Sequence, residues 1–451
     1  MSSEPTAPFA TLQQALERGD DQALSEGAAG LNAADLAEFV ELNLEGGRGL
    51  RLFRALPAER RGIVFGYLEP DVQAELSTLL PMPALAELVT AMSSDERADF
   101  FLLMDSVRQH QLSQLLARRE REDLLRLASY REGTAGALMS SEYATVGGAM
   151  SAGQAIEQLR QTAPETETIY QVYVVDAEHR LQGAVSLRNL ITALPGTRVS
   201  ELMASGLVQA EVETEQEEVA RLIARYDLIA LPIVDAEQRL VGIVTYDDAM
   251  DVAEAEATED MHKGATVEGL DGSFRRASPF SLYRSRIQWL IILVFANLFT
   301  GAGIAHYEQT IADNLALLFF LPLLVASAGN AGAQSATLMV RALATGDVRT
   351  RDWGRLLSRE VLVAAGLGLT MALAVLSVGF LRAGPGIAVV VALTMIAVVM
   401  VGSVVGMLLP FLLHRLRFDP ATASTPLITT IADVSGVVIY FSMATALLGL
   451  A

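Results

Sequence analysis

The chain has 451 residues, enough for several domains, and no cysteine, which excludes disulfides, thiolate metal sites and cysteine nucleophiles. Its formal net charge of -20 is uneven, because residues 281–451 hold ten arginines and seven acidic residues whereas residues 1–280 hold 23 basic and 46 acidic ones. Such an acidic front part repels nucleic acid and concentrates cations, so no nucleic-acid partner is expected.

The residue types that hydrolytic enzymes use are sparse. The five histidines are scattered without the spacing of a zinc site. Lys263 is the only lysine, and because His262 precedes it the chain has no phosphate-binding GK[ST] loop. The first residues have neither the basic nor the apolar region of a secretion signal. We therefore expect neither an enzyme nor a cleaved signal.

Residues 1–135 predict an all-α domain of short helices joined by tight turns. Apolar residues recur at helical spacing in 72–80 and 100–104, and prolines separate the periodic segments. Ser94 is placed to cap the helix that begins near Asp95. A helical solenoid, in which helical hairpins stack, fits this pattern. Taken alone, this part is most simply an interaction scaffold.

Residues 136–258 contain an internal repeat. Residues 173–186 (YVVDAEHRLQGAVS) are matched by residues 232–245 (PIVDAEQRLVGIVT). Each copy predicts a strand, an Asp-containing turn, a second strand and a helix, so we expect two α+β units at 136–198 and 199–258. The repeat resembles a tandem pair of cystathionine-β-synthase (CBS) domains.

CBS pairs commonly bind adenine nucleotides in the cleft between their repeats. The resemblance therefore implies Tyr170, Arg188 and Asp247 as nucleotide contacts, with ATP or another adenine nucleotide as the ligand. A purely structural role is the simpler competing interpretation for each of the three residues.

A run of acidic residues follows the second repeat. Asp247, Asp251 and Glu254 fall on one helical face, and no basic residue lies between Arg239 and Lys263. A like-charge pair one turn apart costs about 0.2–0.5 kcal/mol in a helix, and a divalent cation relieves that cost. The run predicts a cation site at a domain or subunit boundary; a merely solvated acidic face is the alternative.

The membrane part, residues 281–451, is reached through an amphiphilic connector at 259–280. It contains five apolar segments near the length of about 20 residues that crosses a bilayer: 287–305, 314–340, 361–381, 387–413 and 421–449. Arginines precede the first segment (Arg275, Arg276, Arg284, Arg286), separate the second from the third (Arg341, Arg349, Arg351, Arg355, Arg359) and precede the fifth (Arg415, Arg417). The opposite loops hold only Arg382. The positive-inside rule then predicts a cytosolic N-terminal part and a C-terminus outside.

The last apolar segment has one ionisable side chain, Asp433. A carboxylate near the middle of a membrane helix costs at least about 2.5 kcal/mol on insertion scales, so it normally faces a bundle interior or an aqueous path. Thr429, Gly436 and Tyr440 share its helical face. We interpret this stripe as an oxygen-lined path for a hard cation. The alternative is a carboxylate that only hydrogen-bonds between helices.

The second apolar segment is rich in small and polar residues. Its polar residues at helical spacing are Ser327, Asn330, Gln334 and Thr337, and its glycines are Gly329 and Gly332. Interhelical hydrogen bonding is the expected role of Gln334 and Ser335. For Asn330, which lies near these two glycines, a functional role toward the helix of Asp433 and a packing role both stay open.

These motifs together resemble the MgtE family of magnesium channels over nearly the whole chain. The membrane motifs are 329–335 (GNAGAQS) with Pro322, the Asp419-Pro-Ala segment, and 426–433 (PLITTIAD). The motifs of the soluble part are 133–139 (GTAGALM) and 245–248 (TYDD).

The resemblance implies a homodimer embedded in the plasma (inner) membrane that takes up Mg²⁺. Each subunit would have an armadillo-like N-domain, a CBS pair, a connecting plug helix and five membrane helices, with the second and fifth lining a pore on the two-fold axis. Two Asp433 carboxylates would then face each other. Because Mg²⁺ dehydrates reluctantly, Asp433 is expected to hold a largely hydrated ion, with Thr429 nearby and Asn330 as a further pore residue.

Regulation is expected from the acidic part. With little cytosolic Mg²⁺ the negative faces repel, and rising Mg²⁺ bridges them, draws the connecting helices together and closes the pore. The residues assigned to this regulatory site are Asp95, Asp99, Asp247, Asp248, Asp251, Glu254, Glu256 and Glu259. Two other functions stay open, namely a transporter of another divalent cation such as Co²⁺ and a membrane-anchored CBS nucleotide sensor.

Overall fold

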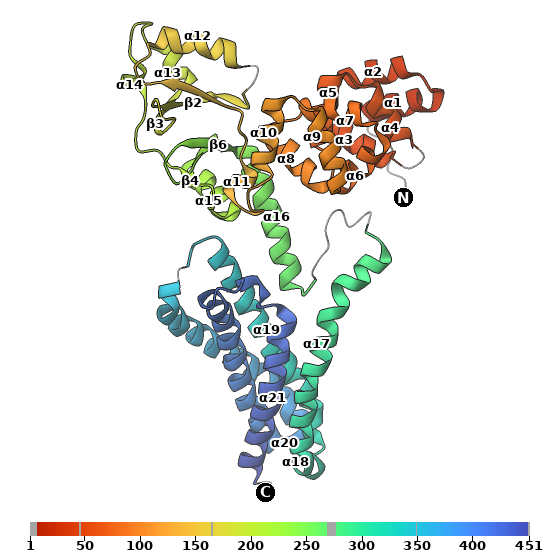
Figure 1. Cartoon of the computed structure of the whole chain (residues 1–451). Coiled ribbons are helices and arrows are strands. Elements are labelled where there is room, and N and C mark those ends of the chain that lie inside the picture. Colours follow the sequence, from red (N-terminus) through yellow and green to blue (C-terminus); the bar gives the residue numbers. More distant parts are fainter. Residues whose placement is uncertain (1–6, 45–46, 164–165, 268–276, 349, 450–451) are drawn as a thin grey trace. The chain divides into compact units, whose positions relative to one another are not determined.

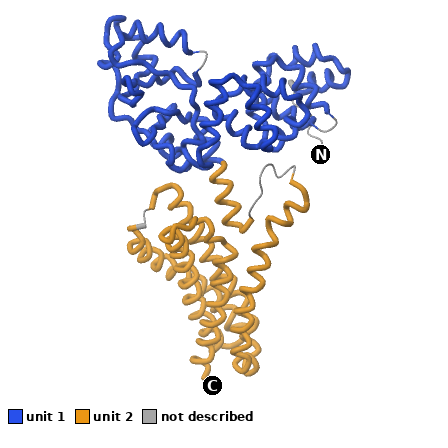
Figure 2. Tube along the Cα trace, viewed as in Figure 1, with its two compact units in different colours: residues 1–254 blue, residues 255–451 orange. Residues whose placement is uncertain are grey.

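The computed structural model describes residues 7–44, 47–163, 166–267, 277–348 and 350–449. It separates into two compact units, residues 1–254 and 255–451, which are described one at a time (Figure 2). The flanking arginines Arg275, Arg276 and Arg349 lie outside the described residues.

The first part of unit 1 is a succession of short helices (Figure 1). They are α1 (Ala7–Arg18), α2 (Asp21–Ala29), α3 (Ala33–Leu42), α4 (Arg48–Ala55), α5 (Ala58–Gly66), α6 (Pro70–Leu79), α7 (Met82–Thr90), α8 (Ser94–Leu103), α9 (Ser106–Leu115) and α10 (Arg118–Leu127). Asp20 and Asp105 cap α2 and α9 by accepting bonds from backbone amides, and Pro70 stands in the first turn of α6, where its missing N–H is not needed. The predicted helical N-terminal domain is confirmed.

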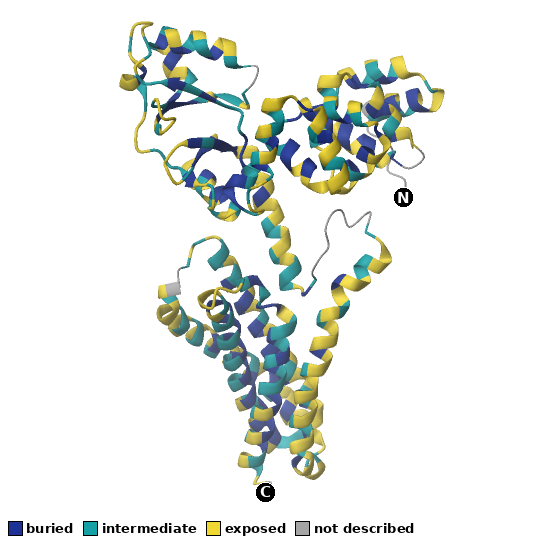
Figure 3. Cartoon of the chain, in the orientation of Figure 1, coloured by how far each residue is buried: buried dark blue, intermediate teal, exposed yellow. Residues whose placement is uncertain are grey.

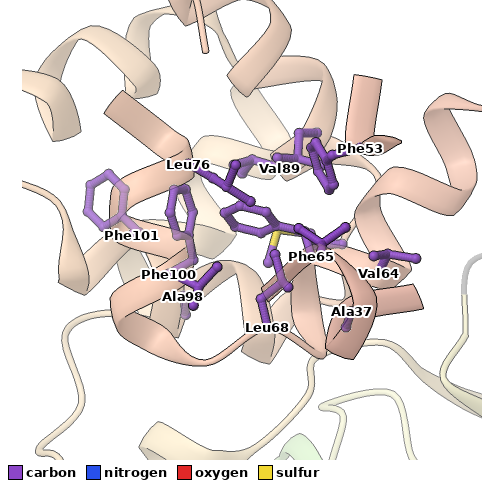
Figure 4. Packing of buried hydrophobic residues seen from close by; sticks show 14 of the residues in the cluster. Ala37, Phe53, Val64, Phe65, Leu68, Leu76, Val89, Ala98, Phe100 and Phe101 are labelled. Carbon is purple, nitrogen blue, oxygen red and sulfur yellow. The ribbon is translucent and has the colours of Figure 1, made fainter. Parts of the chain in front are cut away.

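Aromatic side chains fill the middle of this helical stack. The ring centroids of Phe53 and Phe65 lie 5.9 Å apart, and those of Phe65 and Phe100 lie 4.9 Å apart edge to face (Figure 4). All three side chains are almost fully buried. Since each helix is too short to be stable alone, burial of these rings between helices holds the stack together.

Two small sheets follow, and they repeat the same topology. β1 (Tyr143–Gly147) pairs parallel with β2 (Thr168–Val175), which pairs antiparallel with β3 (Leu181–Ser186). In the second copy, β4 (Ala210–Glu211), β5 (Ala230–Val234) and β6 (Leu240–Thr245) pair in the same order. The accompanying helices are α11 (Ala135–Leu138), α12 (Ala152–Thr162), α13 (Leu187–Thr192), α14 (Val199–Leu202) and α15 (Gln216–Tyr226). The predicted CBS pair is confirmed.

The repeated Asp turn has the same hydrogen bonds in both copies. Asp176 Oδ1 accepts from the backbone amides of Glu178 and Arg180 at 3.0 and 2.8 Å. Asp235 accepts from Glu237 and Arg239 at the same two distances. One carboxylate thus replaces the backbone partners that a tight turn lacks, which explains the Asp in both copies.

The helix α16 (Tyr246–Gly264) leaves β6 and continues as one helix of 19 residues. It runs without a break across the predicted boundary between residues 258 and 259, and its last part belongs to unit 2. The acidic run and the start of the connector are therefore parts of one continuous helix.

Unit 2 is helical throughout its described residues. Its elements after α16 are α17 (Pro279–His306), α18 (Glu308–Asp313), α19 (Ala316–Ala344), η3 (Thr350–Asp352), α20 (Trp353–Arg415), η4 (Pro420–Thr422) and α21 (Thr425–Leu448). Among the described residues, four helices are long and apolar enough to cross a membrane: α17, α19, α20 and α21. The sequence predicted five segments, and two of them, 361–381 and 387–413, both fall within α20.

Small residues allow the membrane helices to approach closely. A side chain at Gly332 of α19 would come within 2.8 Å of the Gly402 carbonyl of α20. Conversely, side chains at Gly402 and Gly406 would overlap the carbonyls of Ala328 and Gly332. In Figure 3 the buried residues lie along the facing sides of α19, α20 and α21, and much of α17 is exposed. Packing of backbones against each other is typical of helices in lipid.

Candidate functional site: a membrane carboxylate and an acidic cluster

Asp433 lies in the third turn of α21, in an otherwise apolar stretch. The helix begins cleanly because Ser424 Oγ accepts from the Leu427 amide at 3.4 Å and Pro426 stands in the first turn. The Asp433 side chain is half-buried. A half-exposed carboxylate in a membrane helix needs water, a cation or another chain beside it.

Of the polar stripe predicted around Asp433, only some residues are accessible and others are buried. The Thr429 hydroxyl donates to the Pro426 carbonyl at 2.9 Å, which leaves its oxygen free to accept or to bind a cation. The Tyr440 hydroxyl is buried and donates to the Leu317 carbonyl at 3.0 Å. Tyr440 therefore fixes α21 on α19, and Gly436 is buried beside Val325.

Asn330 and its neighbour Gly329 take different positions on α19. It is Gly329 that faces α21, because a side chain there would come within 3.0 Å of Thr429 Cγ2, and Asn330 is exposed. A small residue fits best where α19 meets the Thr429 side chain, and the larger Asn330 lies to the side. Ser327 also differs, since it is buried and donates to the Leu323 carbonyl at 2.7 Å.

The exposed polar residues Asn330, Gln334 and Thr337 form one line on α19. Thr337 bonds to its own helix through the Ala333 carbonyl at 2.9 Å. An amide side chain placed in hydrocarbon loses its bonds to water, at a cost of several kcal/mol on alkane scales, about 4–8. The line is therefore suited to an aqueous path or to a second protein chain.

The second group of charges begins at α8 in unit 1. Ser94 does not cap this helix; Ser93 precedes it, and the Ser94 hydroxyl instead lies 3.1 Å from Ser140 Oγ and accepts from the Ser141 amide at 2.8 Å. One turn on, buried Arg97 pairs with Glu142 at 3.0 Å. These contacts hold the start of α8 against the start of the first CBS domain.

They also bury Asp95 among other carboxylates. Within the described residues its Oδ1 is inaccessible to water and has no hydrogen-bond partner. Burial, followed by the charges of Asp248 and Glu167, raises the pKa of Asp95 well above its usual value. A buried oxygen without a partner costs free energy that a bound proton or cation would recover.

Asp248 faces this group from the first turn of α16. It accepts from the backbone amide of Thr245 at 3.2 Å and also from the Thr245 hydroxyl. Burial raises the pKa of Asp248, and the neighbouring Asp247 raises it further. Loss of surrounding water and the charge of Asp248 raise the pKa of Asp99 to about 6.

Two members of the group were missed from the sequence. Burial and the charge of Asp248 raise the pKa of Glu167, just before β2, to about 7. Burial also raises the pKa of Glu96, whose carboxylate lies beside Gly66 and would have to move if residue 66 carried a side chain. Glu96 stands beside Asp95 and was detectable, but Glu167 had no sequence signal because only folding brings it near α16.

The remaining predicted residues lie further along α16. Asp251 and Glu254 are exposed, and partial burial and then Asp247 and Glu254 raise the pKa of Asp251. Glu256 is half-buried, and Glu259 forms an ion pair with Lys263 one turn later. The charge of Glu259 is thus already paired with that of Lys263, an ion pair that the sequence analysis did not predict.

Direct coordination of a metal needs ligands that meet at one point. Within the described ranges, no group of three or more His, Asp or Glu side chains is close enough to hold a metal ion. Mg²⁺ usually keeps several waters and binds proteins through one or two carboxylates. The buried Asp95 oxygen and the crowded charges around Asp248 fit such a hydrated dication.

The three nucleotide candidates, Tyr170, Arg188 and Asp247, are all exposed. Tyr170 in β2 is 67% exposed, and Arg188 at the start of α13 is exposed. Ser186 caps that helix by accepting from the Asn189 amide at 3.1 Å. An aromatic ring can stack on a base, and a guanidinium can pair with phosphate.

Comparison with known families matches most of the chain. The MgtE family, described as a divalent cation transporter, matches residues 321–443. The MgtE intracellular N domain matches residues 31–133, and the CBS domain matches 135–196 and 199–255.

Two magnesium transporters match over most of the chain. The chain is 41% identical over 441 residues to the magnesium transporter MgtE of Thermus thermophilus, which covers 97% of this chain and 98% of that protein. It is 36% identical over 321 residues to the magnesium transporter MgtE of Bacillus subtilis, covering 71% of each chain.

Solved structures resemble the soluble part. The cytosolic domain of the Mg²⁺ channel MgtE in complex with ATP has 41% identity and a TM-score of 0.52, and the match covers 54% of this chain and 99% of that one. The soluble part of a magnesium transporter has 28% identity and a TM-score of 0.52, covering 55% and 98%.

Proposed function

Because this chain belongs to the MgtE family of divalent cation transporters, we propose that it conducts Mg²⁺ into the cell and is closed by cytosolic Mg²⁺. The observation that carries the proposal is Asp433, the lone carboxylate of α21, half-exposed in a helix apolar enough to span a membrane. The names of the relatives support Mg²⁺ as the cargo.

The pore is proposed to form between two copies of the chain. In a two-fold dimer, α19 and α21 of each copy would line the axis, with Asp433, Thr429 and the exposed Asn330 as pore residues. A polar line on a membrane helix is costly against lipid, which supports burial of this face on an axis. Two facing carboxylates would attract a hydrated dication without stripping its water.

Five membrane spans are proposed in each subunit. The 63 residues of α20 would reach about 95 Å as one helix, far beyond the bilayer core of about 30 Å. Gly384 breaks the helix with φ 82° and ψ 171°, and Pro385 follows it. Two spans meeting at Gly384, with the flanking arginines inside, give a cytosolic N-terminus and an outer C-terminus at the plasma (inner) membrane.

Regulation is proposed to act at the acidic residues of unit 1 and at those along the helix α16. Mg²⁺ would bind near Asp95, Asp99 and Asp248, and along Asp247, Asp251, Glu254, Glu256 and Glu259 of α16. Cation binding there relieves carboxylate repulsion that the fold has already built in, as the raised pKa values of Asp95 and Asp248 indicate. The domain boundaries expected from the sequence, 1–135, 136–198, 199–258, 259–280 and 281–451, are kept in this proposal.

A nucleotide is proposed as a second ligand of the CBS pair. The structure of a relative's cytosolic domain in complex with ATP supports this, and the exposed Tyr170 and Arg188 are the contacts proposed here. ATP would then act as a regulatory ligand of the channel.

Single-channel recording across a range of cytosolic Mg²⁺ tests the function. The wild type should carry Mg²⁺ current that cytosolic Mg²⁺ closes. Asp433→Ala should lose the current by at least about 100-fold, because it removes the carboxylate that attracts the dication. Asp347→Ala, which removes an exposed carboxylate elsewhere in unit 2, is the matched control. Normal current in Asp433→Ala, or a Co²⁺ current that exceeds the Mg²⁺ current, would overturn the proposal.

A further inference from the structure

Three arginines follow one another where α20 begins. Arg351 belongs to η3, and Arg355 and Arg359 lie in the first two turns of α20. All three residues are exposed. Residues four apart share a helical face, so Arg355 and Arg359 lie on the same side of α20. We call these three residues the arginine face.

The opposite side of α20 packs against the rest of unit 2. Its buried residues in the first half of the helix are Ala364, Gly368, Ala372, Val375 and Gly379. A side chain at Gly368 would come within 3.0 Å of Ile396 Cα. At 100° per residue, Arg355 and Arg359 lie about 180° and about 140° around the helix from Ala364. The arginine face therefore points away from the packed side.

Apolar side chains continue the arginine face along α20. Leu362, Leu369 and Leu373 are 75%, 54% and 63% exposed. Their spacing from Arg359 keeps them on its side of the helix. Because α20 is apolar enough to cross a membrane, these three residues, the leucine stripe, are suited to contact with acyl chains.

The positions along α20 match the layers of a bilayer. Arg359 precedes Leu362 by about 4.5 Å along the helix axis, and Arg355 precedes it by about 10 Å. The polar layer on each side of the hydrocarbon core is about 5–8 Å thick. Long arginine side chains can extend into that layer from either position. Trp353, which is 53% exposed, is of the residue type enriched at this level.

The arginine face has no counterion on its own helix. Within the described ranges, the guanidinium groups of Arg355 and Arg359 form no ion pair or hydrogen bond. Glu360 is the only acidic residue between Trp353 and Leu381. It is half-buried and lies about 40° from Ala364, on the packed side. Two positive charges one turn apart thus favour an anion from outside the helix.

We propose that the arginine face binds the phosphate of an anionic phospholipid whose acyl chains lie along the leucine stripe. A planar guanidinium pairs with phosphate through two parallel hydrogen bonds. A second protein chain fits less well, because helix interfaces in lipid use small residues and this stripe consists of leucines. The proposal rests on the proposed function only for its side of the membrane, the cytosolic leaflet, where anionic lipids concentrate.

The test measures lipid binding to the full-length protein in a neutral detergent. Native mass spectrometry with phosphatidylglycerol and phosphatidylcholine of equal acyl chains gives a Kd for each lipid. The wild type should bind phosphatidylglycerol at least about fivefold more tightly. Arg355→Gln and Arg359→Gln should each weaken phosphatidylglycerol binding about fivefold, since one basic residue near an anionic surface contributes about 1 kcal/mol. Binding of phosphatidylcholine should not change.

Two further variants complete the design. Arg382→Gln is the matched control, because it removes the same charge from α20 where the guanidinium lies 5.3 Å from the ring centroid of Phe319. It should bind phosphatidylglycerol as the wild type does. Arg355→Lys should lose less affinity than Arg355→Gln, since it keeps the charge without the planar fork. Unfolding midpoints in detergent alone should equal the wild-type value, because the replaced side chains are exposed.

Three results would overturn the proposal. Equal losses in Arg382→Gln and Arg355→Gln would mean that binding follows total charge. Displacement of phosphatidylglycerol by millimolar glycerol phosphate would mean that the site takes a soluble anion. A smaller share of dimer in Arg355→Gln, with phosphatidylglycerol binding unchanged, would make this face a contact between copies of the chain. None of these measurements uses Mg²⁺ current, so channel recording judges the proposed function separately.

Discussion

The two acidic regions of this protein differ in how exposed and how crowded their carboxylates are. In unit 2, Asp433 stands alone in an apolar helix and keeps part of its surface open. In unit 1, carboxylates from α8, the segment before β2 and α16 crowd together. In the part of the chain that the structure describes, one oxygen of Asp95 is buried without a hydrogen-bond partner. A lone accessible charge suits an ion that passes through, whereas crowded charges suit an ion whose binding changes the fold around it.

The largest effect that distinguishes the two regions is expected in the cytosolic Mg²⁺ concentration for half-closure of Asp95→Asn and Asp248→Asn. Each removes a charge from the crowded cluster, so Mg²⁺ gains less on binding there, and half-closure should need about tenfold more cytosolic Mg²⁺. Open-channel conductance should not change. Glu38→Gln, an exposed carboxylate on α3, is the control, and recordings in which it matches Asp95→Asn would refute the distinction between the two regions.

The next effect concerns pH and is confined to the crowded region. The pKa of Asp99 is raised to about 6 and that of Glu167 to about 7, from ordinary values of 3.8 and 4.5. The folded state therefore binds protons more tightly than the unfolded state, and this contribution to stability is full below about pH 4 and is lost as the pH rises to about 7.

Thermal unfolding of the full-length protein in detergent without Mg²⁺ measures this effect. The midpoint should fall between about pH 5 and pH 8, less steeply in Glu167→Gln, and added Mg²⁺ should restore it at the higher pH. A midpoint that rises over this range would mean that the carboxylates are already neutralised in the fold.

A smaller effect is expected from Asn330→Ala in the open region. If the exposed amide borders the ion path, its loss removes one hydrogen bond to the passing ion's water, about 1 kcal/mol, and conductance should fall about fivefold. Thr370→Ala is the control, because Thr370 is exposed on α20 and bonds to the Gly366 carbonyl at 2.9 Å. Equal conductance in both variants would place Asn330 away from the path.

The smallest effect separates packing from conduction within α21. Tyr440→Phe removes the hydrogen bond to the Leu317 carbonyl and should lower stability by about 1 kcal/mol, measured by denaturation in detergent. Mg²⁺ conductance should remain unchanged. A loss of conductance without a loss of stability would mean that Tyr440 lines the cation path, as its helical spacing from Asp433 first suggested.

Local patterns predicted the architecture well. The helical stack, the repeated CBS units and the apolar helices follow from periodicity, turn residues and hydropathy, which act over a few residues. The boundary expected at residue 258 did not appear as a break, because nothing in the sequence of α16 stops a helix before Gly264.

Side-chain orientation was predicted less well. Ser327 and Asn330 are three residues apart, yet one is buried and the other exposed, because the close approach of Gly329 to Thr429 fixes how α19 is turned. Residue spacing shows which residues can share a face, but contacts with a neighbouring helix decide which face is covered.

The amino-acid sequence alone determined the residue types and their order: an acidic soluble part, a duplicated α+β unit and membrane helices with one carboxylate in the last. Only the tertiary structure brought Glu167 to Asp95 and Asp248, and Lys263 to Asp419. Charges act through space, so the pKa of a carboxylate and the partner of an ammonium depend on distances that folding creates between residues far apart in the chain.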